Sequence, residues 1–263
     1  MSGSIGRRPV TALVLLVSSA AFLLVSCSST GGAPDQVTEQ GRNFTQTWRV
    51  FLFGAVAVTA LIWLLVLVAA IRFRRRGDRV PDQRQYNIPL EVLYTVVPVI
   101  IVAALFTLTV VTQRGFTDLD SDPDLRVEVT GFQWQWRFDY VDQGVTVNGT
   151  DAAIPPLVLP VGRTVRIELR ADDVIHSFWV PEFLEKRDLI PGFDNAIDVT
   201  ITKPGRWRGR CAEYCGLDHW KMTFDVYAVP AAEYDAWIAQ TRSLPQPVLA
   251  PLELPPSTTE ASS

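Results

Sequence analysis

Two uncharged apolar stretches constrain the fold of this 263-residue chain more than any other feature. Residues 50–71 and 93–111 contain no Asp, Glu, Lys or Arg. At about 1.5 Å per residue, some twenty helical residues cross the ~30 Å hydrocarbon core of a bilayer. Pro98 lies inside the second stretch, where a membrane helix tolerates it. We therefore predict a transmembrane helical hairpin over residues 47–114.

The charges beside these stretches predict the orientation of the hairpin. An arginine cluster follows the first stretch directly, at Arg72, Arg74, Arg75, Arg76 and Arg79. A charge at the centre of a membrane helix costs roughly 2.5–3.5 kcal/mol, so this cluster lies outside the bilayer. The positive-inside rule places it in the cytoplasm. Everything after residue 114 is then extracytoplasmic.

The N-terminus has the pattern of a secretory signal, because Arg7 and Arg8 precede an apolar run over residues 10–25. The run ends in Leu-Val-Ser-Cys27, which resembles the lipobox of bacterial lipoproteins, where the signal is cut before a cysteine that receives a lipid. The pattern predicts a signal peptide at 1–26, lipid attachment at Cys27 and an extracytoplasmic linker at 27–46. An uncleaved membrane helix is the alternative.

The pattern changes to strands after an acidic linker at residues 118–124. Apolar and polar residues alternate over 125–130 and 132–140, which is typical of half-buried strands. Turn signals separate further predicted strands at 164–169, 174–180, 196–201, 207–211 and 222–229. Many short strands predict an all-β sandwich or small barrel over residues 115–230. A short helix at 231–241 and a disordered, proline-rich tail at 243–263 complete the expected organisation.

Candidate metal ligands are concentrated in one short segment. The chain has 2 His, 3 Cys and 2 Met, and most of them lie at His176, Cys211, Cys215, His219 and Met222. Soft sulfur donors favour copper, zinc or iron–sulfur clusters, and a cluster usually needs more thiolates than this chain offers. Two thiolates can bridge two copper ions with one histidine ending each, while Met222 and the Glu213 carbonyl act as weak ligands. Such a centre suits electron transfer.

Two other interpretations of this segment remain open. Structural zinc accepts two cysteines and two histidines but needs no methionine. A disulfide between Cys211 and Cys215 would persist in an exported domain, but it explains neither His219 nor Met222.

The segment from Cys211 to Met222 resembles subunit II of the haem–copper cytochrome c oxidases, including the glutamate between the cysteines. The resemblance covers most of the mature chain. It implies a cupredoxin-like Greek-key barrel that carries the binuclear copper centre CuA on loops at one end. It also implies a bacterial plasma-membrane complex with subunits I and III, a c-type cytochrome donor, and oxygen reduction in subunit I coupled to proton translocation.

The resemblance gives three further residues a role. Trp134, in Gly-Phe-Gln-Trp-Gln-Trp, corresponds to the electron entry point; an aromatic core strand is the alternative. Glu91 corresponds to a glutamate at the entrance of a proton path into subunit I; an interfacial carboxylate without that role is the alternative. The carboxylate of Glu213 corresponds to a ligand of a magnesium ion shared with subunit I; a surface carboxylate is the alternative. Phe132 and Gln135 depart from the usual pattern around Trp134.

Composition narrows the remaining function classes. The chain lacks a basic patch with interleaved aromatics, which a nucleic-acid-binding protein would have. It also lacks a nucleophile–base pair in its sequence pattern, so we do not expect it to catalyse the making or breaking of covalent bonds itself. After residue 117, carboxylates outnumber Lys and Arg by about ten, a field that can steer a basic redox partner. The leading prediction is the electron-entry subunit of a terminal oxidase. A quinol oxidase subunit II would lack the copper ligands, and a copper-delivery protein would need neither Trp134 nor Glu91.

Overall fold

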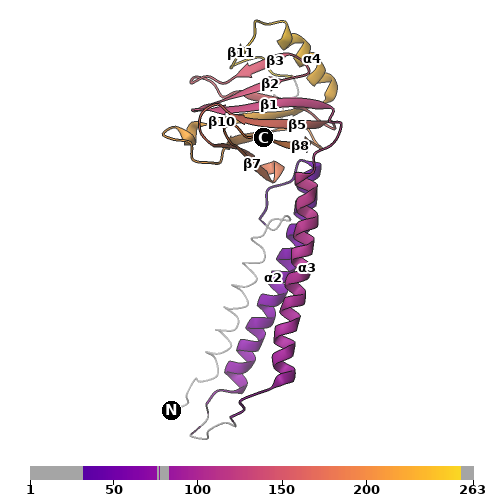
Figure 1. Ribbon diagram of the computed structural model, residues 1–263, viewed down its shortest axis with the longest axis vertical. Coiled ribbons are helices and arrows are strands. Elements are labelled where there is room, and N and C mark those ends of the chain that lie inside the picture. The colour runs from indigo at the N-terminus through magenta and orange to yellow at the C-terminus, as the bar shows by residue number, and fades with distance from the viewer. Residues whose placement is uncertain (1–31, 76, 78–82, 256–263) are drawn as a thin grey trace, which may run out of the picture. The chain divides into compact units, whose positions relative to one another are not determined.

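The computed structural model describes residues 32–75, 77 and 83–255, which are coloured in Figure 1. The predicted signal peptide, the lipid attachment at Cys27, and the arginines Arg76 and Arg79 lie outside these residues. Contacts divide the chain after Asp35, and every helix and strand below belongs to the unit Gln36–Ser263.

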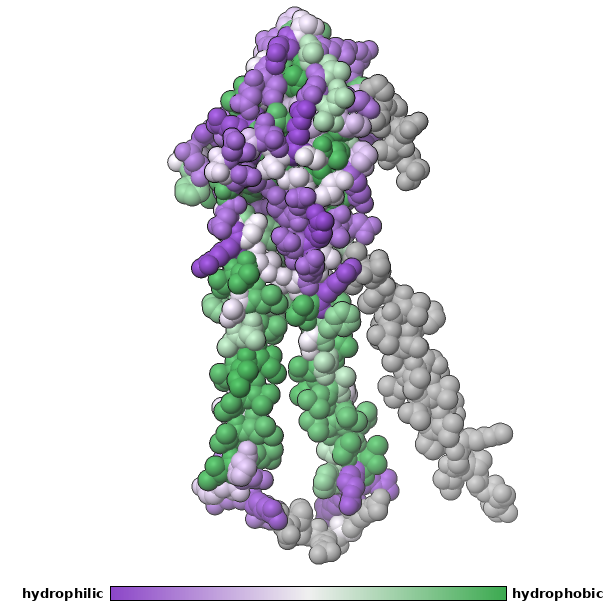
Figure 2. Space-filling model, turned by 90° about the vertical axis from the view of Figure 1, so that its right-hand side faces the viewer, coloured by the Kyte–Doolittle hydropathy of each residue, from purple (hydrophilic) through white to green (hydrophobic). Residues whose placement is uncertain are grey.

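Two long helices, α2 (Glu39–Arg72) and α3 (Ile88–Thr117), contain the two predicted membrane spans. Their apolar side chains face outward, and Figure 2 shows this surface in green, with hydrophilic residues in purple at the lower ends. The helices contact each other through a hydrogen bond between the Thr47 and Thr112 hydroxyls (2.7 Å). The exposed apolar surface is what a bilayer stabilises, so the hairpin prediction is confirmed.

Helix α2 begins eight residues earlier than predicted, so the linker assigned up to residue 46 is too long. The Thr38 side chain caps the helix by accepting a hydrogen bond from the Gly41 N–H (3.0 Å), and Glu39 in the first turn suits the helix dipole. The first turns are polar because Gly41 and Thr45 are buried there in the protein rather than in lipid. The apolar residues therefore predict which part of the helix crosses the membrane, but they do not predict the residue at which the helix begins.

The extracytoplasmic domain is a sandwich of two sheets, as predicted. The six-stranded sheet has the order β11-β3-β2-β1-β5-β8, with bounds β1 (Leu125–Phe132), β2 (Gln135–Tyr140), β3 (Val145–Asn148), β5 (Thr164–Ala171), β8 (Asn195–Thr200) and β11 (Val248–Leu249). The five-stranded sheet has the order β4-β10-β9-β6-β7, with bounds β4 (Pro156–Pro160), β6 (His176–Val180), β7 (Glu185–Leu189), β9 (Gly205–Cys211) and β10 (Thr223–Val229). Pairs β1–β5, β4–β10 and β3–β11 are parallel, and the others are antiparallel.

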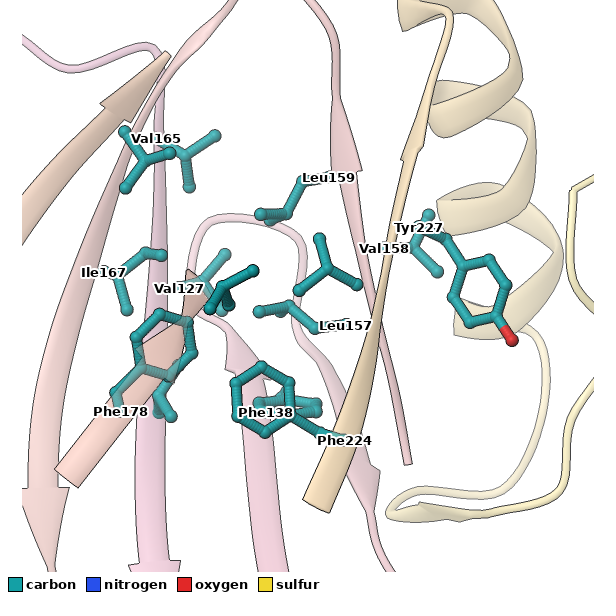
Figure 3. Close-up of a cluster of buried hydrophobic side chains, with 14 of the residues drawn as sticks. Val127, Phe138, Leu157, Val158, Leu159, Val165, Ile167, Phe178, Phe224 and Tyr227 are labelled. Carbon is teal, nitrogen blue, oxygen red and sulfur yellow. The ribbon is translucent and has the colours of Figure 1, made fainter. Parts of the chain in front are cut away.

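The core between the sheets is aromatic near the metal-ligand end. Phe178 and Phe224 stack with ring centroids 4.9 Å apart, and Trp136 meets both rings edge-on. Figure 3 shows part of this core, where aliphatic side chains such as Val127 surround the rings. Burying each large side chain contributes about 1.5–3 kcal/mol. A Cβ at Gly209 would overlap the Phe224 ring, so glycine is required there by packing.

The strand predicted over residues 132–140 is wrong in one respect, because two strands occupy this stretch. Strand β1 ends at Phe132, β2 begins at Gln135, and these two residues pair. Gln133 and Trp134 form the two-residue connection of a hairpin. The alternation of aromatics continues through the turn, and no Gly or Asn marks it, so periodicity could not detect it. Strands β3, β4 and β7 were also not predicted.

The C-terminal residues 243–255, called the C-terminal strap below, pack against the sandwich, so predicting disorder there was wrong. Helix α4 (Ala231–Arg242) forms where expected, and the strap then returns along it. Strand β11 pairs with β3, and the Trp237 indole N–H donates to the Glu253 carbonyl (3.0 Å). Val248 and Ala250 are buried. Figure 1 shows β11, β3 and α4 together.

Backbone contacts join the hairpin to the sandwich. The Val37 N–H donates to the Glu182 carbonyl (3.2 Å), and the Thr202 N–H donates to the Val37 carbonyl (2.8 Å). Glu182 belongs to η1 (Pro181–Phe183), which precedes β7. Arg187 on β7 donates to the Phe116 carbonyl at the end of α3 (3.3 Å). The β7 edge of the five-stranded sheet is therefore its membrane-proximal edge.

Candidate metal centre

Three neighbouring strands bring the predicted metal ligands to one end of the five-stranded sheet. His176 begins β6 and Cys211 ends β9, and these strands pair with each other. His219 begins η2 (His219–Lys221), and Met222 lies directly before β10, which pairs with β9 on its other side. Cys215 lies in the connecting loop. All five side chains predicted as ligands are therefore brought together.

Each sulfur of the two cysteines has its own histidine. The Cys211 Sγ lies 3.8 Å from the His176 Nδ1, and the Cys215 Sγ lies 3.5 Å from the His219 Nδ1. The two sulfurs are 3.8 Å apart. Cys211 Sγ also lies 3.2 Å from the Glu213 carbonyl oxygen, and Cys215 Sγ lies 3.8 Å from the Met222 Sδ. The arrangement consists of two similar halves that meet at the sulfurs.

The cluster is shielded from solvent and is chemically soft. His176 is 0% exposed, and Cys211, Cys215 and Met222 are also buried. The ligand atoms of His176 and both cysteines lie within 4.8 Å of one another, a grouping that can hold a metal ion. Both cysteines are free thiols, so the disulfide interpretation is not supported. Thiolate, imidazole and thioether donors together are typical of copper sites.

The thiols of the two cysteines differ in acidity. Burial raises the pKa of Cys211, but the hydrogen bond with His176 and others around the sulfur outweigh it and lower the pKa to about 7. Burial and the neighbouring Cys211 charge raise the pKa of Cys215 to about 12. A metal that binds both sulfurs as thiolates must therefore displace a tightly held proton from Cys215.

Asp173 orients His176, a role that sequence reasoning missed. Its carboxylate lies 2.8 Å from the His176 Nε2 and also accepts hydrogen bonds from the Gln133 and Val174 N–H groups (2.7 and 2.6 Å). The carboxylate holds the proton on Nε2, which leaves Nδ1 free toward Cys211. The only sequence signal is an aspartate three residues before the histidine.

Gly131 provides the space for the His176 ring. A Cβ there would lie 3.1 Å from the ring atoms Cδ2 and Cγ. Asp173 and Gly131 therefore fix the ring from two sides.

The β1–β2 turn is attached directly to the ligand loop. The Cys215 carbonyl accepts hydrogen bonds from the Gln133 Nε2 (2.7 Å) and from the Trp134 indole N–H (3.3 Å). Gly216 has a φ of +122°, and a Cβ there would lie 3.2 Å from the indole. Trp134, predicted as the electron contact, is half-buried with its ring against a metal-ligand residue, while Trp136 is the core aromatic.

Glu213 faces two ways. Its carbonyl points to Cys211, while its carboxylate is exposed and lies 3.8 Å from the Lys186 Nζ on β7. The same lysine lies 3.4 Å from Asp188. The carboxylate thus lies toward the membrane-proximal edge formed by β7.

Large apolar side chains surround the ligand loop on the surface. Tyr214, Leu217 and Trp220 are 78%, 81% and 74% exposed. The Tyr214 ring meets the His219 ring edge-on at 5.9 Å. Exposed apolar patches of this kind mark protein–protein contacts.

Glu91 lies apart from this centre, at the first turn of α3. Its carboxylate accepts a hydrogen bond from the Asn87 N–H (2.9 Å), and the Asn87 side chain accepts one from the Leu90 N–H (3.4 Å). Glu91 therefore caps the helix at the cytoplasmic mouth of the hairpin.

Comparison with known proteins finds matches to one protein family in both the helical hairpin and the β-sandwich. The family model "Cytochrome C oxidase subunit II, transmembrane domain" matches residues 32–110, and "Cytochrome C oxidase subunit II, periplasmic domain" matches residues 150–229. A probable cytochrome c oxidase subunit 2 of Streptomyces avermitilis is 38% identical over 87% of this chain and 86% of that protein. The one from Nocardia farcinica is 32% identical over 92% of this chain and 86% of that protein. The crystal structure of the periplasmic domain of subunit II from Bradyrhizobium japonicum is 29% identical, covers 47% of this chain and 97% of that one, and has a TM-score of 0.44.

Proposed function

Because the chain belongs to the cytochrome c oxidase subunit II family, and so is a membrane-bound subunit of a haem–copper oxidase with a periplasmic domain, we propose that its buried cysteine–histidine cluster holds the binuclear copper centre CuA. The oxygen chemistry then lies in subunit I, and this chain supplies the route by which electrons reach it.

The paired geometry of the cluster carries this proposal. One half consists of Cys211, His176 and the Glu213 carbonyl, and the other of Cys215, His219 and Met222. Two ions that share both sulfurs would each find one histidine and one weak donor. A single zinc ion would be bound by the two cysteines and two histidines alone, so the Glu213 carbonyl and the Met222 thioether would not be ligands. When bound, the copper pair supplies one-electron transfer with little change in geometry.

The chain itself fixes the donors and excludes water. The ends of strands β6, β9 and β10 hold three of the donors, His176, Cys211 and Met222, and Asp173 sets the tautomer of His176. The aromatic core beneath the site keeps it dry. A rigid, dry site lowers the cost of rearrangement when charge arrives, because its dipoles are oriented in advance.

We place electron entry from a c-type cytochrome at Trp134. The support is the indole N–H bond to the Cys215 carbonyl, which connects a half-exposed ring to a ligand residue through one hydrogen bond. The acidic domain suits a basic donor.

Contact with subunit I is assigned to the membrane-proximal edge near Lys186 and Glu213. This edge adjoins the hairpin through Arg187 and Phe116, and subunit I is itself a membrane protein. The exposed carboxylate of Glu213 is a hard oxygen donor and would complete a magnesium site shared with subunit I by exchanging its contact with Lys186 for the ion. Subunit III would join the same complex.

Two further assignments concern the membrane side. Glu91 is proposed to stand at the entrance of a proton path, and Glu91→Gln in the complete oxidase should reduce proton pumping; unchanged pumping would leave it as a helix cap only. Cys27 is proposed to carry a lipid, so the native mature chain should begin at Cys27 and its N-terminal peptide should exceed its sequence mass by that of the lipid chains. A peptide mass equal to the sequence mass would remove the lipoprotein assignment.

Metal analysis with electron paramagnetic resonance on the purified full-length chain tests the central proposal. The expected result is two coppers per chain that share one unpaired electron. Cys215→Ser should abolish this signal, whereas Ser177→Ala, which alters a buried hydroxyl bonded to Asp188 beside the site, should keep it. One copper per chain, or zinc alone in metal-replete protein, would refute the bridged centre.

A further inference from the structure

A hollow of about 570 Å³ lies beside Trp134. The β1–β2 turn forms one wall, and part of the ligand loop, including Asp218 and Lys221, forms another. The third wall consists of residues 150–154, between β3 and β4. This third wall belongs neither to the metal ligands nor to the predicted entry motif, although it borders the same space as Trp134.

The third wall is a tight turn. Thr150 and Ala153 exchange two backbone hydrogen bonds (3.3 and 3.2 Å), which places Asp151 at the exposed tip. Ile154 adds an exposed apolar surface. Among the residues that the structure describes, Asp151 has no ion-pair partner, whereas Asp218 pairs with Lys221 (2.9 Å). The hollow thus combines a mostly polar lining with the aromatic ring of Trp134 and one unpaired carboxylate, that of Asp151, at its rim.

Thr150 connects this turn to two different parts of the chain. Its carbonyl accepts a hydrogen bond from the Gln135 Nε2 (3.0 Å), next to Trp134. Its hydroxyl donates to the Ala250 carbonyl of the C-terminal strap (3.4 Å). The strap is fixed there by the Ala250 N–H bond to the Asn148 carbonyl (3.0 Å) and by the pairing of β11 with β3. The turn is therefore held between the strap and the Trp134 hairpin.

We infer that the C-terminal strap is a positioning element for electron entry, because it holds the Thr150–Ala153 turn as one wall of the hollow in which a basic donor protein contacts Trp134. A cationic side chain of the donor suits this hollow, since it would meet the Asp151 carboxylate at the rim and an aromatic face inside. The inference rests on the proposed entry at Trp134.

The test compares Thr150→Val with Thr150→Ser in the complete purified oxidase. Valine has the shape of threonine but lacks the hydroxyl, whereas serine keeps it. The probe is a reduced, basic, soluble mitochondrial-type cytochrome c, and KM, kcat and the copper spectrum are measured. Loss of the hydrogen bond from the Thr150 hydroxyl should raise the KM of the valine variant by about two- to tenfold. The serine variant should have the native KM, and both should have the native kcat and spectrum.

Two companion variants complete the design. A chain ending after Gln246 lacks the Ala250 contact and should show at least the same rise in KM. Asp151→Asn should raise KM most at low ionic strength, while Asp122→Asn, an exposed carboxylate in the α3–β1 linker, should not. Equal KM values for native, Thr150→Val and truncated enzymes would overturn the inference. A changed copper spectrum in Thr150→Val would also overturn it, because the strap would then support the centre itself.

The result separates this inference from the proposed function. If Trp134→Ala slows electron entry while Thr150→Val changes nothing, only the strap's role fails. If Trp134→Ala also changes nothing, the entry route fails as well.

Discussion

Removal of the Asp173 carboxylate should loosen the metal centre without removing any metal ligand. In Asp173→Ala, the His176 Nε2–H loses its acceptor at 2.8 Å. The ring is 0% exposed but the Asp173 side chain is 31% exposed, so a water that enters in place of the carboxylate would be an unfixed acceptor without its negative charge. The imidazole would then be free to rotate or change tautomer, which would turn Nδ1 away from Cys211.

The magnitude follows from the contacts that are lost. A buried donor without a partner costs about 1–3 kcal/mol. The Gln133 and Val174 N–H groups also lose an acceptor, but they lie at the surface, where water can replace it. Outer-sphere partners of metal-bound histidines typically contribute 10–100-fold in metal affinity, which is about 1.4–2.7 kcal/mol. We therefore expect copper affinity to fall by one to two orders of magnitude.

Chelator competition on the full-length chain, followed by the copper spectrum, measures this change. Asp172→Ala is the matched control, because Asp172 is the adjacent residue and its carboxylate, among the residues that the structure describes, forms an ion pair only with Arg137 at the surface (3.3 Å). Such an exposed ion pair contributes about 0–1 kcal/mol, so copper affinity should stay within a few-fold of the native value. Equal copper affinity in Asp173→Ala and the native chain would refute the orienting role.

Three other substitutions test separate parts of the fold and site. Gly131→Ala places a Cβ 3.1 Å from the His176 ring and should cost about 1–3 kcal/mol of stability, seen as a lower Tm and weaker copper binding. Trp134→Ala should slow electron entry in stopped-flow mixing with reduced cytochrome while both coppers stay bound; an unchanged rate would exclude it as the main route. Tyr140→Phe removes a buried hydroxyl that bonds both the N–H and the carbonyl of Val158 (2.8 and 3.1 Å), and should lower the Tm by the equivalent of about 1–3 kcal/mol. A Tm equal to the native value would contradict that assignment.

The candidate metal ligands could be predicted from the sequence because their signal is local. Four of them lie within twelve residues, and their chemical types are scarce elsewhere in the chain. His176 is distant in sequence, but the pairing of Phe178 with Cys211 brings β6 to β9. That pairing could not be read from alternation, which indicates that a strand exists but not which strand is its neighbour.

Asp173 and the Trp134 turn could not be predicted for a different reason. An aspartate near a histidine is common in loops, and only the loop geometry brings this carboxylate to the Nε2 atom. Trp134 continues the aromatic alternation of its neighbours, so the pattern hides the turn that separates it from the core. In both cases, function depends on a contact between loops, and loop contacts leave little trace in residue periodicity.

The C-terminal strap shows the limit of composition. Five prolines in residues 243–263 predict the absence of helix and of central strand. They do not predict the absence of packing partners. Two residues of the strap, in β11, pair with β3. Single hydrogen bonds, such as that from the Trp237 indole to the Glu253 carbonyl, hold other parts of the strap against the sandwich. A segment can therefore be poor in regular structure and still be part of the sandwich.

The Cys215 carbonyl explains why electron entry and metal retention can be altered separately. It accepts two hydrogen bonds from the β1–β2 turn, and the one from Gln133 is the shorter, at 2.7 Å against 3.3 Å from Trp134. Removing the indole leaves the shorter bond in place, so the ligand loop stays anchored and copper should remain. Removing the Gln133 amide instead breaks the stronger anchor while the aromatic ring remains. Gln133→Ala should therefore weaken copper binding more than Trp134→Ala does, and the reverse order would show that the indole, not the amide, holds the loop.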